Sequence, residues 1–187
     1  MVLLSGFAFR QKLVSDGARQ IISFHIPGEF LDLQNCMFEV ADHNVQSLGR
    51  STIAIVPKGP LAALMAARPT IARAMWIDSL IDASIFREWV VNVGRRDARE
   101  RIAHLMCELA ARLRKAGLDD GPVFDFPITQ EQIADATGLT SVHTNRTLQA
   151  LRKDGLISLS SSKLTIVDWD QLAEVGDFNR RYLHQSA

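Results

Sequence analysis

One segment, residues 128–167, constrains the fold of this chain more than any other part of it. It reads ITQEQIADATGLTSVHTNRTLQALRKDGLISLSSSKLTIV. Thr129 is suited to cap the start of a helix, and Gln132, three residues later, completes a capping box. Gly138 can end that helix, because glycine adopts a positive φ without steric cost. The pattern predicts a short helix followed by a tight turn.

A second helix and a β-hairpin are expected directly after that turn. Thr140 can cap the second helix, and Asp154 with Gly155 can break it. The residues expected to face inward are Val142, Leu148 and Leu151. Two β-prone runs follow, at 156–159 and 164–167. The order of helix, turn, helix and hairpin predicts a winged helix-turn-helix, which indicates DNA binding.

The second helix of such a unit enters the major groove with its N-terminal residues toward the base edges. The residues expected to be exposed there are Ser141, His143, Thr144, Asn145 and Arg146. Arginine can bind both acceptors of a guanine, and asparagine can bind adenine in a similar two-bond arrangement. The candidate DNA-binding residues are Thr129, Gln130, Thr140, Ser141, Val142, His143, Asn145 and Arg146. Two alternatives stay open: Asn145 and Arg146 on a merely solvated face, and Val142 either packed inward or on a thymine methyl.

The charge distribution predicts only modest non-specific attraction to DNA. The chain has 21 basic and 21 acidic residues, so its formal net charge is zero at pH 7. Residues 94–118 carry a net charge of +4, and residues 119–187 carry −4. A dimer needs only local positive charge, which Arg146, Arg152 and Lys153 can supply.

Cysteine usage favours a reducing compartment and no metal centre. Cys36 and Cys107 lie far apart in the sequence, and His143 has no second ligand at a suitable spacing.

No nucleophile, metal or phosphate-loop motif is present, so we expect no cofactor and no enzymatic activity. His104 is expected on a charged helix face. Residues 1–4 do not form a signal peptide and no apolar run could span a bilayer, so a soluble cytoplasmic protein is expected.

The whole chain divides into three zones of an expected α+β fold. Residues 1–69 alternate β-prone runs with turns, which predicts an antiparallel β-roll with strands at 2–14, 20–26 and 51–56. Residues 70–117 are expected to form two helices, at 70–93 and 95–116, interrupted at Gly94. Residues 118–187 are the winged unit, closed by a helix from 169 to 182.

The first long helix carries an apolar stripe that needs a partner. Its residues are Ile77, Leu80, Ile81, Ile85 and Trp89. The partner is either the β zone alone or the same helix of a second subunit. Helix-turn-helix operators usually have twofold symmetry, which favours a homodimer that uses this stripe.

The order of these zones resembles the Crp/Fnr family of bacterial transcription regulators. The resemblance rests on residues 128–157, on RRDARERIAHLMCELAARL at 95–113 and on IPGEFLDLQ at 26–34. It implies a β-roll that senses an effector, a dimerisation helix, and a winged helix that binds a palindromic operator beside a promoter, with RNA polymerase as a further partner. It also implies that Arg146 reads a guanine, and that Thr129, Thr140 and His143 contact phosphates.

The chain departs from the family pattern in ways that affect both sites. Ser141 and Val142 stand where many members have arginine and glutamate, which predicts a different operator half-site. The residues at the implied effector pocket are Gly28, Glu29, Asp32, His43 and Asn44. None of them is the arginine that would pair with a cyclic phosphodiester. We therefore expect an effector other than cyclic AMP, namely another small molecule.

Two further expectations come from the same comparison. The oxygen-sensing branch carries an N-terminal cysteine cluster, which this chain lacks. The turn at 28–30 lies nearer the start of the chain than in family members, so the β-roll is expected to be incomplete. The alternative function is an effector-binding or protein-interaction module whose winged helix does not bind DNA.

Overall fold

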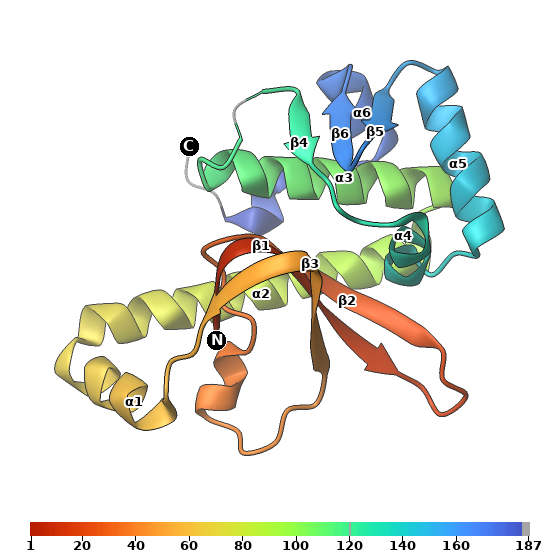
Figure 1. Ribbon diagram of the computed structural model, residues 1–187. Coiled ribbons are helices and arrows are strands. Elements are labelled where there is room, and N and C mark those ends of the chain that lie inside the picture. Colours follow the sequence, from red (N-terminus) through yellow and green to blue (C-terminus); the bar gives the residue numbers. More distant parts are fainter. Residues whose placement is uncertain (120, 185–187) are drawn as a thin grey trace.

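The structure is a computed structural model that describes residues 1–119 and 121–184. Its helices, strands and two 3₁₀ turns (η) are, in chain order, β1 Val2–Leu13, β2 Arg19–His25, η1 Leu33–Cys36, β3 Asn44–Ala54, α1 Lys58–Ala67, α2 Pro69–Arg95, α3 Ala98–Lys115, β4 Val123–Asp125, α4 Gln130–Thr137, α5 Ser141–Lys153, β5 Ile157–Ser160, β6 Lys163–Ile166, α6 Trp169–Val175 and η2 Arg180–Leu183. The predicted α+β class with an antiparallel sheet and a C-terminal winged helix is confirmed. Figure 1 shows α3 between the N-terminal sheet and the winged unit.

The N-terminal sheet is antiparallel with strand order β2-β1-β3. Its apolar face joins the core, and Phe9 pairs with Phe24 across β1 and β2. Gly6 has a φ of +81° at a register shift between β1 and β3, and a Cβ there would lie 2.5 Å from the Ser51 hydroxyl. Only glycine fits such a close approach of two strands.

Two boundaries in this zone differ from the sequence-based expectation. The third strand was expected at 51–56 but runs over 44–54, because its first residues pair with the end of β1. Residues 58–67 form helix α1 where β structure was expected, and only Leu61 of that helix is buried. Pro57 is the N-cap of this helix and Pro60 lies in its first turn, where a missing backbone N–H removes no hydrogen bond within the helix.

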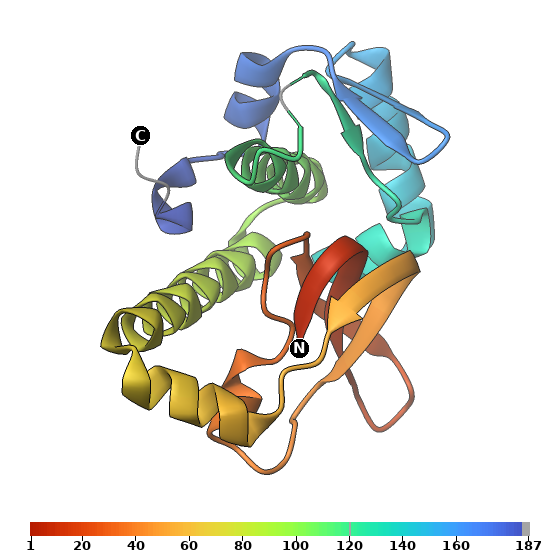
Figure 2. The ribbon, with the colours of Figure 1, turned by 60° about the vertical axis from the view of Figure 1, so that its left-hand side comes forward.

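Helix α2 was expected to be interrupted at Gly94, but it continues to Arg95. The interruption comes at Arg96, whose backbone is extended, and Asp97 then caps α3. The Asp97 carboxylate accepts a hydrogen bond from the backbone N–H of Glu100, and the Glu100 carboxylate accepts one from the backbone N–H of Asp97. This capping box fixes the corner between the two helices. Figure 2 shows α2 leading away from α3, with α1 at its far end.

The winged unit packs on α3. Its strands have the order β4-β6-β5, and the short strand β4 was not expected. The closing helix expected at 169–182 is split into α6 and η2. It breaks at Gly176, where a Cβ would lie 2.7 Å from the backbone nitrogen of His104. The close contact with α3 therefore requires a glycine at this position.

One continuous core extends from the N-terminal sheet through α3 to the winged unit. Every residue of α3 from Ile102 to Leu113 is buried, because both halves of the molecule pack against this helix. No helix within the described residues is long and apolar enough to cross a membrane. Helix α5 lies at the edge of the molecule, on the side of α3 opposite most of the N-terminal sheet (Figure 1).

Candidate nucleic-acid interface

The helix-turn-helix is set by local capping. Thr129 and Gln132 form the predicted capping box of α4, and Gly138 ends α4 with a φ of +65°. The hydroxyl of Thr140 accepts from the backbone N–H of His143 at 3.2 Å and so caps α5. Both helix starts therefore leave backbone N–H groups at the surface, where phosphates can bind.

The outward face of α5 differs in part from the expected one. Leu148 and Leu151 point inward, as predicted, and Thr144 is fully buried beside them rather than exposed. Val142 is 64% exposed, so its expected inward orientation is wrong. Val142 lies nine positions before the buried Leu151, which places it about 180° away around the helix and therefore on the opposite face.

Four exposed side chains follow one another along α5 at helical spacing. They are Val142, Asn145, Arg146 and Gln149. Gln149 was not among the predicted DNA-binding residues, although its spacing of three from Arg146 could have indicated it. Arg146 forms no hydrogen bond or ion pair with residues 1–119 and 121–184, so its guanidinium is free to bind a ligand. Ser141 and His143 are also exposed and flank this face.

The N-terminal sheet touches the helix-turn-helix directly. Arg19 at the start of β2 donates from Nε to Asp135 of α4 at 2.7 Å. Gln20 donates to the backbone oxygen of Ala136, also in α4, at 3.4 Å. From the other side, Arg101 of α3 donates to the backbone oxygen of Thr137 at 2.9 Å. The first helix of the DNA-binding unit is therefore held between the sheet and α3.

Comparison with known proteins assigns this architecture. A family model described as Crp-like helix-turn-helix domain matches residues 100–175. The transcriptional activator protein FnrL of Cereibacter sphaeroides is 29% identical over 176 residues, which cover 92% of this chain and 70% of FnrL. The nitrogen fixation regulation protein FixK of Bradyrhizobium diazoefficiens is 29% identical over 168 residues, which cover 89% of this chain and 69% of FixK.

The fold is also that of a solved structure. FixK2 from Bradyrhizobium japonicum superposes with a TM-score of 0.79 at 22% identity, covering 93% of this chain and 85% of FixK2. The chain belongs to the Crp/Fnr family. As a Crp/Fnr protein it is a DNA-binding regulator of transcription.

A cleft of about 570 Å³ lies between the N-terminal sheet and α2 of this Crp/Fnr protein. Of the five residues predicted for an effector pocket, all within the described part of the chain, Glu29 and His43 line it. Gly28, Asp32 and Asn44 do not. Asp32 instead forms an ion pair with the amino group of Met1.

Three charged groups of this cleft, Arg10, Asp78 and Asp82, were not predicted from the sequence. Arg10 of β1 donates to Asp82 of α2 at 2.6 Å, so the two walls are joined by an ion pair. Asp78, one turn earlier on α2, also lines the cleft. Burial, reinforced by the negative charges of Glu29 and Asp82, raises the pKa of Asp78. The cleft is therefore polar and carries carboxylates on both walls.

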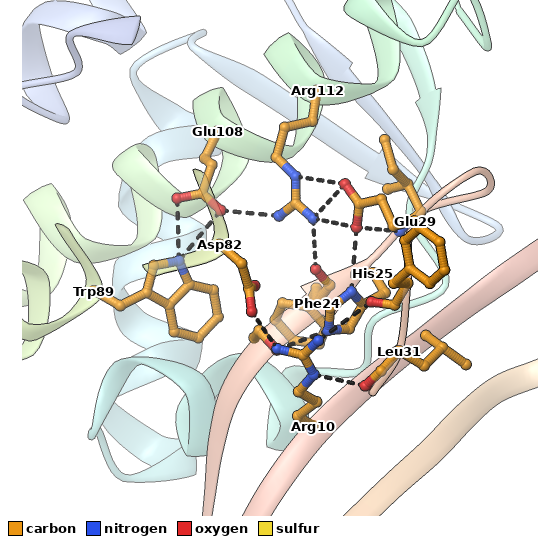
Figure 3. Close-up of polar contacts among 12 residues, drawn as sticks. Arg10, Phe24, His25, Glu29, Leu31, Asp82, Trp89, Glu108 and Arg112 are labelled. Carbon is orange, nitrogen blue, oxygen red and sulfur yellow. Dashed lines mark hydrogen bonds and ion pairs between the residues drawn. The ribbon is translucent and has the colours of Figure 1, made fainter. Parts of the chain in front are cut away.

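Behind the cleft, a buried polar network joins the sheet, α2 and α3 (Figure 3). The guanidinium of Arg112 donates to Glu29 at 2.7 Å, to Glu108 at 3.1 Å and to the backbone oxygen of Phe24 at 2.7 Å. The indole N–H of Trp89 donates to the same Glu108 carboxylate at 3.0 Å. Arg112 is thus the central group of the network. Glu29, which was expected as a turn residue, is an ion-pair partner of α3.

The two carboxylates of the network respond differently to burial. Burial alone would raise the pKa of Glu29, but the positive charge of Arg112 and the contact with His25 hold it at about 2. Glu108 is completely buried, and burial raises its pKa despite the charge of Arg112. The Arg112 guanidinium therefore compensates two carboxylates that water solvates poorly.

His104 was expected on a charged helix face, but it is buried, with 1% of its surface exposed. Its Nδ1 contacts the backbone oxygen of Gly176 and its Nε2 contacts the Tyr182 hydroxyl, both at 3.0 Å. Burial, with help from the positive charge of Arg96, lowers the pKa of His104 to about 4. The neutral imidazole ties the last part of the chain to α3.

This shift predicts a loss of stability in mild acid. The unfolded chain takes up a proton near pH 6.5, whereas folded His104 takes it up only near pH 4. The free energy of unfolding should therefore fall by about 3 kcal/mol as the pH drops through this window. The lowered pKa of buried His25 acts in the same sense. Urea unfolding measured across this pH range should show a shallower slope for His104→Gln, and an unchanged slope for exposed His143→Gln. Equal slopes for wild type and His104→Gln would contradict this account.

The apolar stripe predicted on α2 divides into two faces. Ile85 and Trp89 are 9% and 7% exposed and pack in the core of their own subunit, where Trp89 meets Phe24 at a ring distance of 5.9 Å. Ile81 packs partly against the same core. Ile77 and Leu80 remain exposed.

A second stripe on α2 is left at the surface. Its residues are Trp76, Leu80, Ala83, Arg87, Val90 and Gly94. Their spacing alternates between four and three residues, as it does along the contact face of a two-stranded coiled coil. Trp76, Leu80 and Val90 are 68%, 53% and 56% exposed. The face available to a second subunit is therefore shifted from the one expected.

Both cysteines are free. Cys107 is buried on α3, and burial raises the pKa of its thiol to about 12, so that the thiol stays protonated. Among residues 1–119 and 121–184, no three His, Cys, Asp or Glu side chains are grouped as metal ligands would be.

Proposed function

We propose that this Crp/Fnr regulator acts in the cytoplasm as a homodimer that binds a palindromic operator through α5. The observation that carries the proposal is the exposed face of α5, on which Arg146 has no partner among the described residues and lies beside Asn145 and Val142. Arg146 would take both acceptors of a guanine, and Val142 would contact a thymine methyl. Thr129, Thr140 and His143 lie at the two helix starts and would contact phosphates, whereas Ser141 would lie near the base edges.

The exposed stripe of α2 supports the dimer. Two copies of α2 joined along Trp76, Leu80 and Val90 would cover apolar surface that one subunit leaves in water. A parallel seam relates the two recognition helices by a twofold axis, as a palindromic operator requires. Since FnrL carries the name of a transcriptional activator, contact with RNA polymerase belongs to the proposal.

The polar cleft supports an effector that is not a cyclic nucleotide. Four cations line the cleft. Arg10, Lys12 and Arg112 are already paired with Asp82, Asp42 and Glu29, and Arg87 belongs to the exposed stripe of α2. A phosphodiester placed there would face the carboxylates of Asp78 and Glu29, which repel it. An effector that bridged the sheet and α2 would favour one relative position of the two subunits, which the contact of Arg19 with Asp135 would pass to α4.

The proposal is tested by selecting binding sites from a random duplex library at moderate salt. An inverted repeat with half-sites about one helical turn apart is the expected result. Enrichment of a single asymmetric site would contradict the dimer. A folded dimer that retains no duplex at low salt would favour the alternative, a module whose winged helix binds protein.

Replacing Arg146 with alanine should weaken specific binding by about 1–3 kcal/mol, because a two-bond contact with guanine is lost. The preference at one operator position should relax, while the other positions keep theirs. Arg152→Ala, which removes a charge but no expected base contact, is the matched control and should weaken all duplexes alike. An Arg146→Ala protein that binds the operator as tightly as wild type would show that α5 is oriented differently.

A further inference from the structure

Two amide side chains join the start of α4 to the start of the recognition helix. The side-chain nitrogen Nε2 of Gln130 donates to the backbone oxygen of Ser141 at 3.0 Å. The oxygen Oε1 of Gln130 accepts from Nδ2 of Asn145 at 3.1 Å. Ser141 and Asn145 are exposed and Gln130 is half-buried, so these bonds lie at the surface and contribute little to the core. They do, however, hold the side-chain amide of Asn145 on the exposed face of α5.

The chemistry of the groups fixes the direction of both amides. A backbone carbonyl can only accept, so Gln130 must turn its NH₂ group toward Ser141. Its oxygen then faces Asn145, which must answer with its own NH₂ group, because two amide oxygens would repel each other. The Oδ1 of Asn145 and its second N–H are left without a partner among the described residues. The order of donor and acceptor that Asn145 presents is thereby determined.

We infer that Gln130 is a positioning residue that fixes the amide of Asn145 for reading adenine. Adenine offers N7 as an acceptor and its N6 amine as a donor in the major groove, and an amide matches this pair with one N–H and one oxygen. Without Gln130, the amide can turn over and exchange its donor with its acceptor. The turned amide places an N–H against the N6 amine and loses the match. This inference rests on the proposed function and gives Gln130 a role other than contact with phosphate.

The experiment compares Gln130→Met with wild type on four duplexes. The duplexes carry each of the four bases at the operator position whose preference is lost in Asn145→Ala, with the change made in both half-sites. Methionine keeps the length of the side chain but makes neither hydrogen bond. Gln171→Met, the same substitution on the exposed surface of α6, is the matched control. Circular dichroism confirms that each variant is folded.

Wild type and Gln171→Met should prefer adenine at this position by roughly 5- to 100-fold. In Gln130→Met the preference should shrink to about twofold, since the amide is no longer held in one direction. Preferences at all other positions should persist. In the double variant Gln130→Met/Asn145→Ala, the Gln130 substitution should change nothing further at this position, since it acts through Asn145.

Three results would overturn the inference. An equal loss of affinity for all four duplexes, with the adenine preference intact, would make Gln130 a phosphate contact. A preference for another base in wild type would refute the assigned direction of the amide. Additive effects in the double variant would separate Gln130 from Asn145. A wild-type protein that prefers no duplex at any position would instead refute the proposed function itself.

Discussion

Replacing Arg112 with leucine is expected to lower the free energy of unfolding by about 3–5 kcal/mol, because the change leaves buried carboxylates without a counter-charge. The Arg112 side chain is 7% exposed and pairs with Glu29 and with the fully buried Glu108. It also donates to the backbone oxygen of Phe24, which no leucine can replace. The contacts with Glu29 and Phe24 join α3 to the N-terminal part of the chain, whereas the contact with Glu108 lies within α3, so the variant should loosen the packing of α3 on the sheet.

Urea unfolding at neutral pH measures this effect. Arg50→Leu, on the exposed surface of β3, is the matched control and should change the unfolding free energy by less than about 0.5 kcal/mol. Adding Glu108→Gln to Arg112→Leu should restore part of the loss, since it removes a buried charge that lacks compensation. If Arg112→Leu costs less than about 1 kcal/mol, the network does not hold the sheet against α3.

Replacing Leu80 with glutamate is expected to yield monomers that bind the operator about 10²- to 10⁴-fold more weakly than wild type. Leu80 lies at the centre of the exposed stripe on α2, and in a symmetric seam two glutamates would face each other. A monomer keeps one recognition helix and loses the second, tethered contact. Sedimentation gives the oligomeric state, and titration of operator duplex gives the affinity.

Ile71→Glu is the control for this prediction. Ile71 is an exposed apolar residue of the same helix, but it lies on the side opposite the stripe. The variant should remain a dimer and bind the operator as wild type does. A Leu80→Glu protein that still sediments as a dimer would place the subunit interface elsewhere. Ile85→Glu is unsuitable for the same purpose, because Ile85 is buried in its own subunit and the variant should fail to fold.

The sequence predicted those parts of the fold that depend on local interactions. Thr129, Gly138 and Thr140 each cap a helix through residues two to four positions away, and each acts as expected. The capping box at Asp97 and Glu100 follows the same rule, and it marks the start of α3 more reliably than Gly94 does. Helix boundaries at such caps can therefore be read from sequence alone.

Residues that act through distant partners could not be predicted in this way. Glu29 and Arg112 are 83 positions apart, and only the packing of α3 against the sheet brings them together. His104 reads as a polar residue among charged neighbours, and its burial depends on Gly176, 72 positions later. On α5, the exposure of Val142 follows from the helical phase set by Leu148, whereas the burial of Thr144 reflects packing that the polar side chain conceals.

The central claim, sequence-specific binding of a dimer, is tested most directly by one comparison of affinities. The selected inverted repeat and a duplex of the same composition with scrambled half-sites are titrated at physiological salt, and the mass of each complex is determined. We expect two protomers per duplex and an affinity for the inverted repeat at least about 10³-fold higher than for the scrambled duplex. Equal affinities for the two duplexes would contradict the claim.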